Sequence, residues 1–462
     1  MAKRRKISLG LLGSGVVGEA VQDIVFQDLD DKVGDDFELV IRKIFTRNPR
    51  SKKWYGRRSS LFTNKAEEVI DDPGVDIVIE ALGFQEPSEL PLLKKYILRA
   101  FQNGKPVVTS DKAVLARFGD EILAAAAKSG QPLRFEACVG GGIPIIRSLS
   151  ESFAAEEPQA VFGIVNGTCN YILSQMEKGS KPYASALREA QQNGYAETNP
   201  AADVSGRDAE AKLLLLVMVA FGLQLKPGTL WRKGIEEIHG IDFLYAAKKG
   251  SGTIKHLAVA KRIGAAVQIF VSPALISHNH LLSRIEGATN AICFKGRKSG
   301  NSLAERDCDY VFVGPGAGGG PTAVAILGDV CELARGERDH RRGFLSWSPP
   351  GSLKVTAAHD LDGSFYVRFL VKDRAGIIGD IGQTFGREGV NISEIWQLAH
   401  SQEELKGLVH NYKITIKPTE VLPFVITLEH ATVGQMRKAL DIICHHDYIL
   451  AEPVWFPIWR GK

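Results

Sequence analysis

The segment KISLGLLGSGVVGEAVQDIV, from Lys6 to Val25, decides the fold of the N-terminal part of the chain. It contains a short apolar run, then three closely spaced glycines, then an amphipathic continuation. Glycines at this spacing let the backbone approach a pyrophosphate, and the following helix presents free N–H groups at its N-terminus. The segment therefore predicts a strand, a turn and a helix that bind a dinucleotide. The residues expected to contact it are Gly13, Ser14, Gly15, Val16, Val17 and Gly18.

Apolar runs continue to alternate with helical patterns after this segment. The runs are FELVIRKIF, VDIVIEALG, KPVVTS and LRFEACVG, and ELPLLKKYILRAFQNG is one of the helical patterns between them. Strands that alternate with helices favour a parallel, doubly wound sheet, so the fold class expected is α/β with a Rossmann-type domain. We expect this dinucleotide-binding domain to span residues 1–142.

The end of the second predicted strand bears on the choice of cofactor. An acidic residue at this point usually holds the ribose hydroxyls of NAD, but here the chain has Phe45, Thr46 and Arg47, with more basic residues at positions 50, 52 and 53. A guanidinium group such as that of Arg47 pairs well with a 2′-phosphate. NADP is therefore favoured over NAD, although a solvated basic loop in an enzyme that uses either cofactor is the alternative.

Composition excludes several classes of function. The chain has 462 residues, of which 44% are hydrophobic and 24% charged, and this length and composition predict several globular domains. Its formal net charge is only +4, which predicts no nucleic-acid-binding face. The longest apolar stretch, LLLLVMVAFGL, is too short to span a bilayer and predicts a buried helix. Six scattered cysteines without metal-ligand spacing indicate reduced thiols, so we expect a cytoplasmic protein without membrane partners.

The rest of the chain predicts two further domains. Residues 143–312 mix helical and strand-like segments and are expected to form an α+β substrate-binding and dimerisation domain. Residues 313–337 are expected to form a glycine-rich loop and a helix that returns to the nucleotide domain, and residues 338–360, with two prolines, a linker. Residues 361–457 read as strand, helix, strand, strand, helix and strand, with LVHNYKITI as the third strand, which predicts a ferredoxin-like unit.

Candidate chemistry is concentrated in the segment NGYAETNPAADVSGRDAEAK. Asp208 and Lys212 are four residues apart, so on a helix they share one face at the edge of the apolar run that follows. Partial burial would make Lys212 a better proton donor or acceptor, and Asp208 would orient it or bind a cationic substrate group. A surface salt bridge is the alternative for that pair. Glu197 and Asp203 lie in the loop-like stretch just before it, where carboxylates could receive an α-amino group, and solvated loop charges are the alternative.

Four runs, in this order after the dinucleotide fingerprint, resemble the homoserine dehydrogenase family: EACVGGGIPII, VNGTCNYIL, GYAETNPAADVSGRDAEAK and GPGAGGGPTA. The resemblance implies NAD(P)-dependent, reversible oxidation of L-homoserine to L-aspartate 4-semialdehyde, on the route to threonine, methionine and isoleucine. It assigns Lys212 as general acid and base, Asp208 and Glu197 as substrate-binding carboxylates, and Lys112 as the lysine between nicotinamide and substrate. Gly318 matches a cofactor contact, and Gly194 is expected to shape the substrate pocket.

The same resemblance implies a monovalent cation, usually sodium, held largely by main-chain carbonyls. The matching residues are Glu136, Val139, Gly141 and Ile143. One departure from the family lies beside Lys112, where Asp111 stands in place of the usual Asn, which changes the expected charge at the nicotinamide pocket.

The C-terminal segment FYVRFLVKDRAGIIGDIGQTFGREGVNISEIWQL resembles the ACT family of amino-acid-binding regulatory domains. Asp373, Gly376 and residues 391–393 stand at the matching turns, whereas Ala375 replaces the usual proline. The resemblance implies threonine, the end product of the pathway, as effector, and a homodimer or homotetramer as the assembly. A structural dimerisation module that binds no ligand is the alternative.

Two other functions are compatible with the same scaffold. One is a different NADP-dependent semialdehyde or imine reductase. The phosphorylating semialdehyde dehydrogenases need a nucleophilic cysteine with a histidine partner, and neither Cys138 nor Cys169 has a histidine nearby in sequence. The other is a non-catalytic amino-acid sensor, against which the joint presence of Glu197, Asp208 and Lys212 argues.

Overall fold

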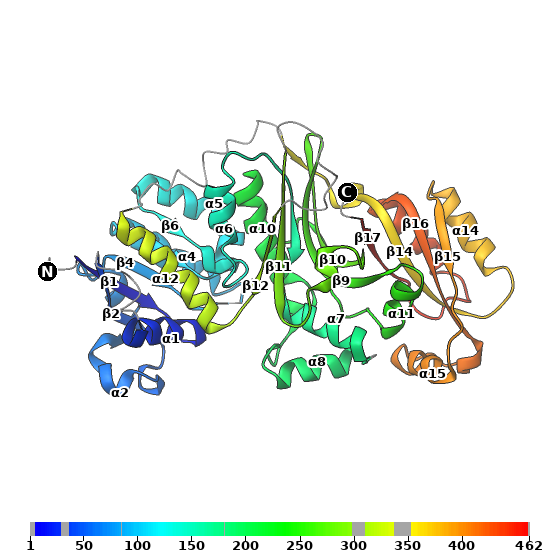
Figure 1. Cartoon of the computed structure of the whole chain (residues 1–462), viewed down its shortest axis with the longest axis horizontal. Coiled ribbons are helices and arrows are strands. Elements are labelled where there is room, and N and C mark those ends of the chain that lie inside the picture. Colours follow the sequence, from blue (N-terminus) through cyan, green and yellow to red (C-terminus); the bar gives the residue numbers. More distant parts are fainter. Residues whose placement is uncertain are drawn as a thin grey trace.

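The computed structural model describes residues 5–28, 37–84, 86–179, 181–297, 310–336 and 353–460. Within them the chain forms two β-sheets, one of six strands and one of eleven. The smaller sheet lies at the N-terminal end, and the larger one runs from the middle of the molecule into the C-terminal part (Figure 1). The predicted linker lies mostly outside the described residues.

The N-terminal sheet is parallel throughout, with strand order β3-β2-β1-β4-β5-β6. This confirms the predicted doubly wound, Rossmann-like sheet. The strand order reverses direction between β1 and β4, and ligands of such sheets bind in the crevice at the carboxyl ends of the strands at this switch point. The strands are β1 Arg5–Leu12, β2 Phe37–Phe45, β3 Phe62–Thr63, β4 Ile77–Glu80, β5 Val107–Thr109 and β6 Leu133–Arg134.

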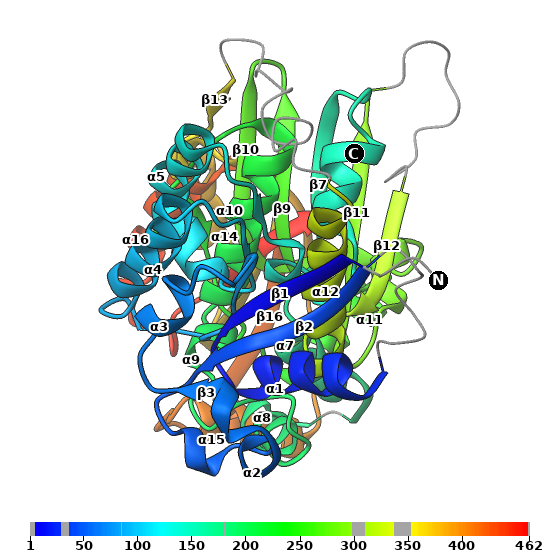
Figure 2. The same cartoon turned by 90° about the vertical axis from the view of Figure 1, so that its left-hand side faces the viewer.

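Helices cover this sheet, and one of them arrives from much later in the chain. Helix α12 packs beside α1, where Ala323 and Ile326 join Leu9 and Leu11 of β1 in one buried cluster (Figure 2). The late glycine-rich run is therefore brought to the first glycine turn. The helices are α1 Val16–Asp23, α2 Tyr55–Arg58, α3 Glu67–Ile70, α4 Leu90–Gln102, α5 Lys112–Ser129 and α12 Gly319–Arg335.

Helix α10, Arg207–Phe221, connects the two halves of the molecule. Its apolar run from Leu213 is buried on all sides, between α5 of the first domain and strands of the second sheet, as predicted for a helix with no polar face. No helix among the described residues has the length and apolarity needed to cross a membrane. The other helices of this region are α6 Ile145–Arg147, α7 Gly167–Gly179, α8 Tyr183–Gln192, α9 Ala201–Val204 and α11 Gly240–Lys248.

The second sheet has the order β12-β11-β7-β9-β10-β17-β14-β16-β15, and short strands β8 and β13 pair with β10. Its middle part is built on the long antiparallel hairpin of β9 and β10. The strands of this part are β7 Pro158–Ile164, β8 Trp231–Arg232, β9 Gly252–Ile263, β10 Ala266–Ser277, β11 Thr289–Gly296, β12 Tyr310–Pro315 and β13 Lys354–Val355.

The C-terminal module has the element and strand order of a ferredoxin-like unit, with antiparallel neighbours in the order β17-β14-β16-β15. One predicted strand is wrong: LVHNYKITI forms the end of helix α15 and the loop after it. Ser401 and Glu404 make a reciprocal capping box that starts this helix, and the true third strand follows it. The elements are β14 Asp362–Lys372, α14 Ile377–Arg387, β15 Ile392–Trp396, α15 Gln402–Asn411, β16 Val421–Thr432, α16 Val433–Ile443 and β17 Val454–Trp459.

Strand β17 joins the middle part of the large sheet to the C-terminal module. Its end pairs in parallel with β10, through Ile458 opposite Leu275, while the strand pairs antiparallel with β14. Trp455 stacks on Trp231, with ring centroids 5.3 Å apart. The tryptophan-rich ending, for which the sequence alone offered no role, therefore attaches the C-terminal module to the rest of the chain.

Candidate active site

The three glycines of the first turn are needed for different structural reasons. Gly13 has a φ of +111°, and a Cβ there would lie 2.2 Å from the carbonyl oxygen of Ala81. A Cβ at Gly18 would lie 2.3 Å from the carbonyl oxygen of Gly13, whereas one at Gly15 would meet nothing within 4 Å. Gly13 and Gly18 thus allow close packing, and Gly15 leaves open space before α1. No side chain of the described residues caps this helix, so its first N–H groups are available to a pyrophosphate.

The second glycine-rich loop reaches the same turn. Gly318 has a φ of +114° and immediately precedes α12. A Cβ at the next residue, Gly319, would lie 2.9 Å from the carbonyl oxygen of Val16. Gly318 therefore lies near the N-terminus of α1, where the sequence analysis expected it to contact the cofactor.

Arg47 follows β2 and is exposed, and it makes no hydrogen bond or ion pair with any residue that the structure describes. Of the basic residues behind it, Arg50 is also exposed, but the two lysines are less available. Lys53 lies 2.8 Å from a carboxylate oxygen of Asp23, and Lys52 lies 3.5 Å from one of Glu19, so both pair with α1. Arg47 is thus better placed than the two lysines to meet an added phosphate.

Two lysines from different domains share one aspartate. The Nζ of Lys112, the first residue of α5, lies 3.1 Å from Oδ1 of Asp208, and the Nζ of Lys212 lies 2.7 Å from Oδ2 of the same side chain. Lys212 also donates to the main-chain oxygen of Val165 at 2.8 Å, and its side chain is only 10% exposed. The pairing expected from the i, i+4 spacing is present, and Lys112 joins it across the domain boundary.

Asn166 organises the carboxylates around this pair, although sequence reasoning assigned it no role. Its Nδ2 donates to Oδ1 of Asp203 at 2.7 Å and to Oδ2 of Asp208 at 2.8 Å, while its Oδ1 accepts from the N–H of Cys169 at the start of α7. An asparagine between a strand and a helix is a common N-cap, which is the signal that could have identified it.

The charges at this site are strongly coupled. Burial opposes ionisation of Asp208, but Lys212, Lys112 and the Asn166 amide together lower its pKa well below the ordinary value. Asp208 in turn raises the pKa of Lys112 against the effect of burial, so Lys112 is a fixed positive charge. The pKa of Asp203 is raised, first by burial and then by the neighbouring charge of Asp208.

Two predicted substrate residues lie in the loop between α8 and α9. Glu197 is exposed, and its carboxylate makes no hydrogen bond or ion pair with a described residue. Gly194 has a φ of +74°, with open space where a side chain would be. The fold therefore leaves Glu197 outside the lysine–aspartate cluster, which consists of Lys112, Asp208 and Lys212.

A second group of buried acids lies beside Lys112, at the carboxyl ends of β4 and β5. Glu80 accepts a hydrogen bond from the hydroxyl of Thr109 at 2.5 Å and one from the N–H of Leu82 at 2.8 Å. Asp111 is the N-cap of α5 and accepts from the N–H of Ala113. Sequence reasoning noted Asp111 only as a departure from the family, and Glu80 carried no signal because it ends an apolar strand.

The residues predicted to hold a monovalent cation lie on one turn. Both carboxylate oxygens of Glu136 accept N–H groups, from Ile146 and Arg147, so this side chain is already engaged. Among the described residues there is no group of three or more His, Cys, Asp or Glu side chains suited to a metal ion. Val139 and Ile143 are apolar, so this set could offer an ion mainly main-chain oxygens.

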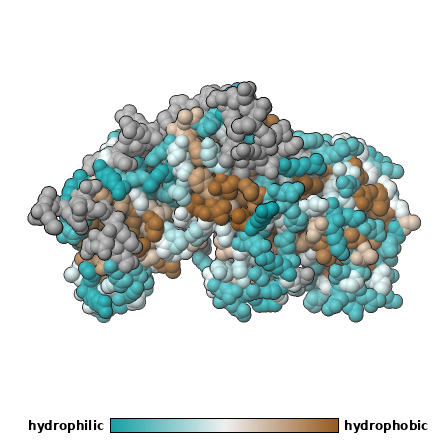
Figure 3. All heavy atoms as spheres, in the orientation of Figure 1, coloured by the Kyte–Doolittle hydropathy of each residue, from teal (hydrophilic) through white to brown (hydrophobic). Residues whose placement is uncertain are grey.

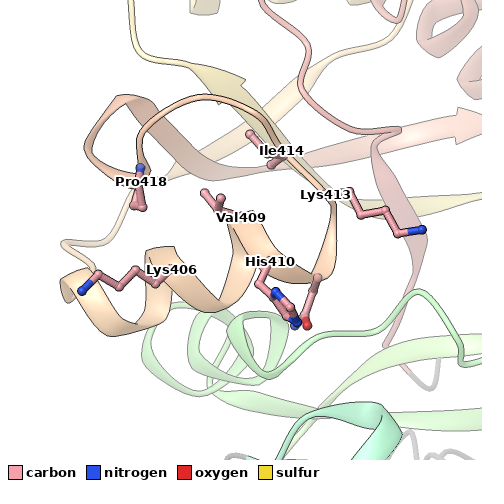
Figure 4. A pocket seen from close by; sticks show the side chains of 7 residues that line it. Lys406, Val409, His410, Lys413, Ile414 and Pro418 are labelled. Carbon is pink, nitrogen blue, oxygen red and sulfur yellow. The ribbon is translucent and has the colours of Figure 1, made fainter.

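Other features do not add to this site. Cys138 and Cys169 are buried, and burial raises the pKa of both thiols well above the ordinary value, which disfavours a thiolate nucleophile. An open hollow of about 670 Å³ lies between α15 and the loop after it (Figure 4). Residues 406–418 supply its lining, and Lys406 and Lys413 point away from it.

A dinucleotide-binding sheet with an open helix N-terminus, joined to a buried lysine–carboxylate cluster, defines a nicotinamide-dependent oxidoreductase. Residues 13–136 match the family described as "Homoserine dehydrogenase, NAD binding domain", and residues 144–331 match "Homoserine dehydrogenase". The chain therefore belongs to the homoserine dehydrogenase family.

Individual relatives agree with the family match. The chain is 34% identical to a homoserine dehydrogenase of Bacillus subtilis over 88% of this chain and 91% of that protein. It is 37% identical to one of Mycobacterium tuberculosis over 85% and 87% of the two chains. The crystal structure of a homoserine dehydrogenase from Thiobacillus denitrificans superposes with a TM-score of 0.83 at 28% identity, covering 99% of both chains.

Proposed function

We propose that the chain catalyses the reversible, NADP-dependent oxidation of L-homoserine to L-aspartate 4-semialdehyde, in threonine, methionine and isoleucine biosynthesis. The observation that carries the proposal is the cluster of Lys112, Asp208 and Lys212, which places two ammonium groups and their shared carboxylate where the nucleotide and substrate domains meet.

Lys212 is the proton-transferring residue in this proposal. A lysine ammonium has three N–H donors, and Asp208 and the Val165 carbonyl engage two of them. The third is left for the substrate oxygen, which gains a proton when the aldehyde becomes an alcohol and loses it in the reverse direction. Lys112 places a permanent positive charge beside the same point, because Asp208 keeps it protonated. The bound cofactor would supply or accept the hydride.

The carboxylates orient the other end of the substrate. Homoserine carries an α-ammonium group, and Asp208 and Glu197 are the residues proposed to receive it, with Gly194 shaping the loop. Glu197 is exposed, so its part requires the loop to meet the substrate from the solvent side. Asp203 is a further carboxylate next to this cluster, because Asn166 donates to both Asp203 and Asp208.

The preference for NADP rests on Arg47, the exposed guanidinium after β2. Replacing it by serine should reduce kcat/KM with NADP about tenfold and leave the value with NAD nearly unchanged, because NAD lacks the 2′-phosphate. Lys53→Ala is the matched control, since Lys53 already pairs with Asp23 and should affect neither cofactor. Equal loss with both cofactors would contradict this role.

A monovalent cation, sodium in the first instance, is proposed at residues Glu136, Val139, Gly141 and Ile143. The side chain of Asn290 is fully buried, and neither its amide oxygen nor its amide nitrogen has a hydrogen-bond partner among the described residues. These unpaired atoms support a bound group near this turn. A Cβ at Gly316 would lie 2.0 Å from this amide, and one at Gly141 would lie 2.9 Å from Gly316. Sodium-dependent thermal stabilisation would test the site; equal stability in sodium and tetramethylammonium salts would contradict it.

The C-terminal ferredoxin-like module is proposed to be an ACT domain that senses threonine. Gly376, with a φ of +94°, and Asp373 lie in the turn between β14 and α14 that matches the family's ligand-binding turn. Threonine can act only by binding one conformational state more tightly than another. Inhibition and thermal stabilisation by threonine, but not by D-threonine, would support the proposal. The absence of both effects would favour a purely structural module.

A homodimer or homotetramer in the cytoplasm is proposed as the working assembly. Hydrophobic residues gather at the middle of one face, over β11 and its neighbouring strands (Figure 3), and Tyr310 and Val313 of the adjacent β12 are 43% and 55% exposed. An apolar patch of this kind commonly marks an interface. Light scattering would measure the assembly, and a monomer at micromolar concentration would contradict it.

The experiment that tests the main proposal is a spectrophotometric assay of the full chain. Homoserine should cause a rise in NADPH absorbance with NADP, and aspartate semialdehyde a fall with NADPH. A different semialdehyde reductase would show turnover without homoserine dependence, and a non-catalytic sensor would show none. Either result would contradict the proposal.

A further inference from the structure

Helix α10 presents two different faces to its surroundings. Asp208 and Lys212 are four residues apart and belong to the lysine–aspartate cluster, whereas Gly206 and Glu210 form a second pair at the same spacing, about half a turn away round the helix. Glu210 is 2% exposed and takes no part in the mechanism above. The contacts of this second face therefore determine how firmly the first turn of α10, and with it Asp208, is held.

Residues 228–238, which we call the linking segment, supply contacts to this second face. The N–H of Gly228 donates to one carboxylate oxygen of Glu210 at 2.6 Å, and the guanidinium of Arg232 forms an ion pair with the other. A Cβ at Gly206, the N-cap of α10, would lie 3.2 Å from Cγ of Arg232. Both carboxylate oxygens of Glu210 are thus engaged by the linking segment, and the stem of Arg232 packs against the start of the helix.

The linking segment also contacts the chain just before α10. The N–H of Ile235 donates to the main-chain oxygen of Val204 at 2.9 Å, and a Cβ at Gly234 would lie 2.4 Å from that same oxygen. Burial lowers the pKa of His256 to about 4, so its ring is neutral and its Nε2–H donates to the main-chain oxygen of Lys233 at 3.0 Å. The linking segment and the start of α10 therefore form one closely packed unit.

The other side of the linking segment meets the C-terminal module. Trp231 stacks on Trp455 of β17, and the ammonium of Lys233 donates to the main-chain oxygen of Trp455 at 3.1 Å. Lys233 also pairs with Glu237 within the segment at 2.9 Å. Arg368 of β14 donates to the main-chain oxygen of Glu237 at 3.2 Å. The linking segment is therefore in contact with α10 on one side and with two strands of the module on the other.

We propose that Arg232 is a positioning residue for the reaction, which acts through Glu210 to keep Asp208 in the lysine–aspartate cluster, and that the linking segment makes this positioning depend on the C-terminal module. The inference rests on the proposed function, because it concerns the same cluster. A change in how the module packs on the linking segment would reach Asp208 through Arg232 and Glu210.

Arg232→Met tests the positioning role. The first turn of α10 is then held less firmly, so kcat for homoserine oxidation should fall about tenfold, because small misplacements of catalytic groups are costly. The Kd for NADPH should stay within about twofold, since the cofactor turn lies on other elements. Arg232→Lys should recover most of the loss, because a single guanidinium nitrogen, Nη1, contacts Glu210 and an ammonium can replace it. Lys226→Ala, which removes an exposed lysine beside the segment, should change neither quantity.

A loss of folding is separated from a loss of positioning by measuring the free energy of unfolding of each variant. Arg232→Met leaves Glu210 buried without its counter-charge, whereas the double variant Arg232→Met with Glu210→Gln leaves no unpaired buried charge. The double variant should fold and should still have a lowered kcat. A lower free energy of unfolding with an unchanged kcat in both variants would overturn the inference, as would equal losses of kcat in Arg232→Lys and Arg232→Met.

Amide hydrogen exchange measures how firmly α10 is held without any turnover. The N–H of Glu210 donates to the main-chain oxygen of Gly206 at 2.9 Å, and its exchange reports local opening of the first turn. Exchange in residues 207–213 should be about tenfold faster in Arg232→Met. It should also be faster in Lys233→Met, which removes the ammonium that meets Trp455, and unchanged in Lys226→Ala. Unaltered exchange in Arg232→Met would overturn the positioning role, and unaltered exchange in Lys233→Met would overturn its dependence on the module.

Failure of the proposed function would give a different result. If the unmodified chain shows no homoserine turnover, that function is contradicted, while the exchange experiment still decides the inference. If the unmodified chain and Arg232→Met oxidise homoserine at the same rate, the inference alone is contradicted.

Discussion

Arg368 and Asp242 form an ion pair across the boundary between the C-terminal module and the middle of the chain. The Nε of Arg368 on β14 lies 2.7 Å from Oδ1 of Asp242 on α11, and both side chains are excluded from solvent. The hydroxyls of Tyr366 and Tyr412 complete their hydrogen bonds. The C-terminal module is therefore attached by a buried charge pair as well as by β17.

Breaking this pair should destabilise the protein strongly. Arg368→Ala leaves Asp242 buried without its counter-charge, and such a loss costs about 3–5 kcal/mol. The free energy of unfolding from denaturant titration measures the effect. Arg374→Ala is the control, because its partner Asp447 is exposed and the loss should be below about 1 kcal/mol. Similar small losses in the two variants would show that the buried pair does not hold the module.

Gly13 and Gly15, two of the three glycines of the first turn, should respond differently to alanine. Gly13→Ala places a Cβ 2.2 Å from a carbonyl at a φ of +111°, so we expect a loss of stability of at least about 1–3 kcal/mol. Gly15→Ala should leave the melting temperature nearly unchanged but weaken NADP binding about tenfold, because its Cβ enters the open space before α1. Thermal melts and binding titrations separate the two outcomes, and unaltered binding in Gly15→Ala would place the pyrophosphate elsewhere.

Glu80 should make the stability of the chain depend on pH. Burial and the charge of Asp111 raise the pKa of Glu80 in the folded state, so the folded protein binds more protons there than the unfolded chain does. This acid therefore lowers stability progressively as the pH rises above the unfolded value of about 4.3.

Glu80→Gln removes that titration, and its amide oxygen can still accept the hydrogen bond from the Thr109 hydroxyl. Relative to the unmodified chain it should gain at least about 1 kcal/mol of stability between pH ~5 and pH ~8, measured by denaturant unfolding at both values. A stability difference that stays constant with pH would mean that Glu80 is ionised throughout.

Features with a local signature in the sequence were predicted well. The parallel sheet and the glycine turn follow from strand–helix alternation and from residue spacing, and the ion pair of Asp208 with Lys212 follows from helical periodicity. The end of α15 was mistaken for a strand, because apolar residues alternate in LVHNYKITI while the capping box that starts the helix lies outside that run.

Features that depend on tertiary packing could not be read from the sequence. Lys112 meets Asp208 only because α5 and α10 pack together, and Asn166 joins two carboxylates that are separated from it by dozens of residues. Glu80 ends the apolar strand β4, so its position in the sequence gives no sign of a functional role. The resemblance to a family supplied Lys112 and added a role for Glu197, which the loop pattern had already singled out. The fold brings Lys112 to Asp208 but leaves Glu197 exposed.

The most direct test of the account is the rate of homoserine oxidation by Lys212→Ala, measured alongside its affinity for NADPH. Loss of the proton-transferring amine should lower kcat by about 10²–10⁴-fold, while the dissociation constant for NADPH stays within about twofold, because the cofactor turn lies on other elements. Turnover close to that of the unmodified chain would contradict the central role given to Lys212.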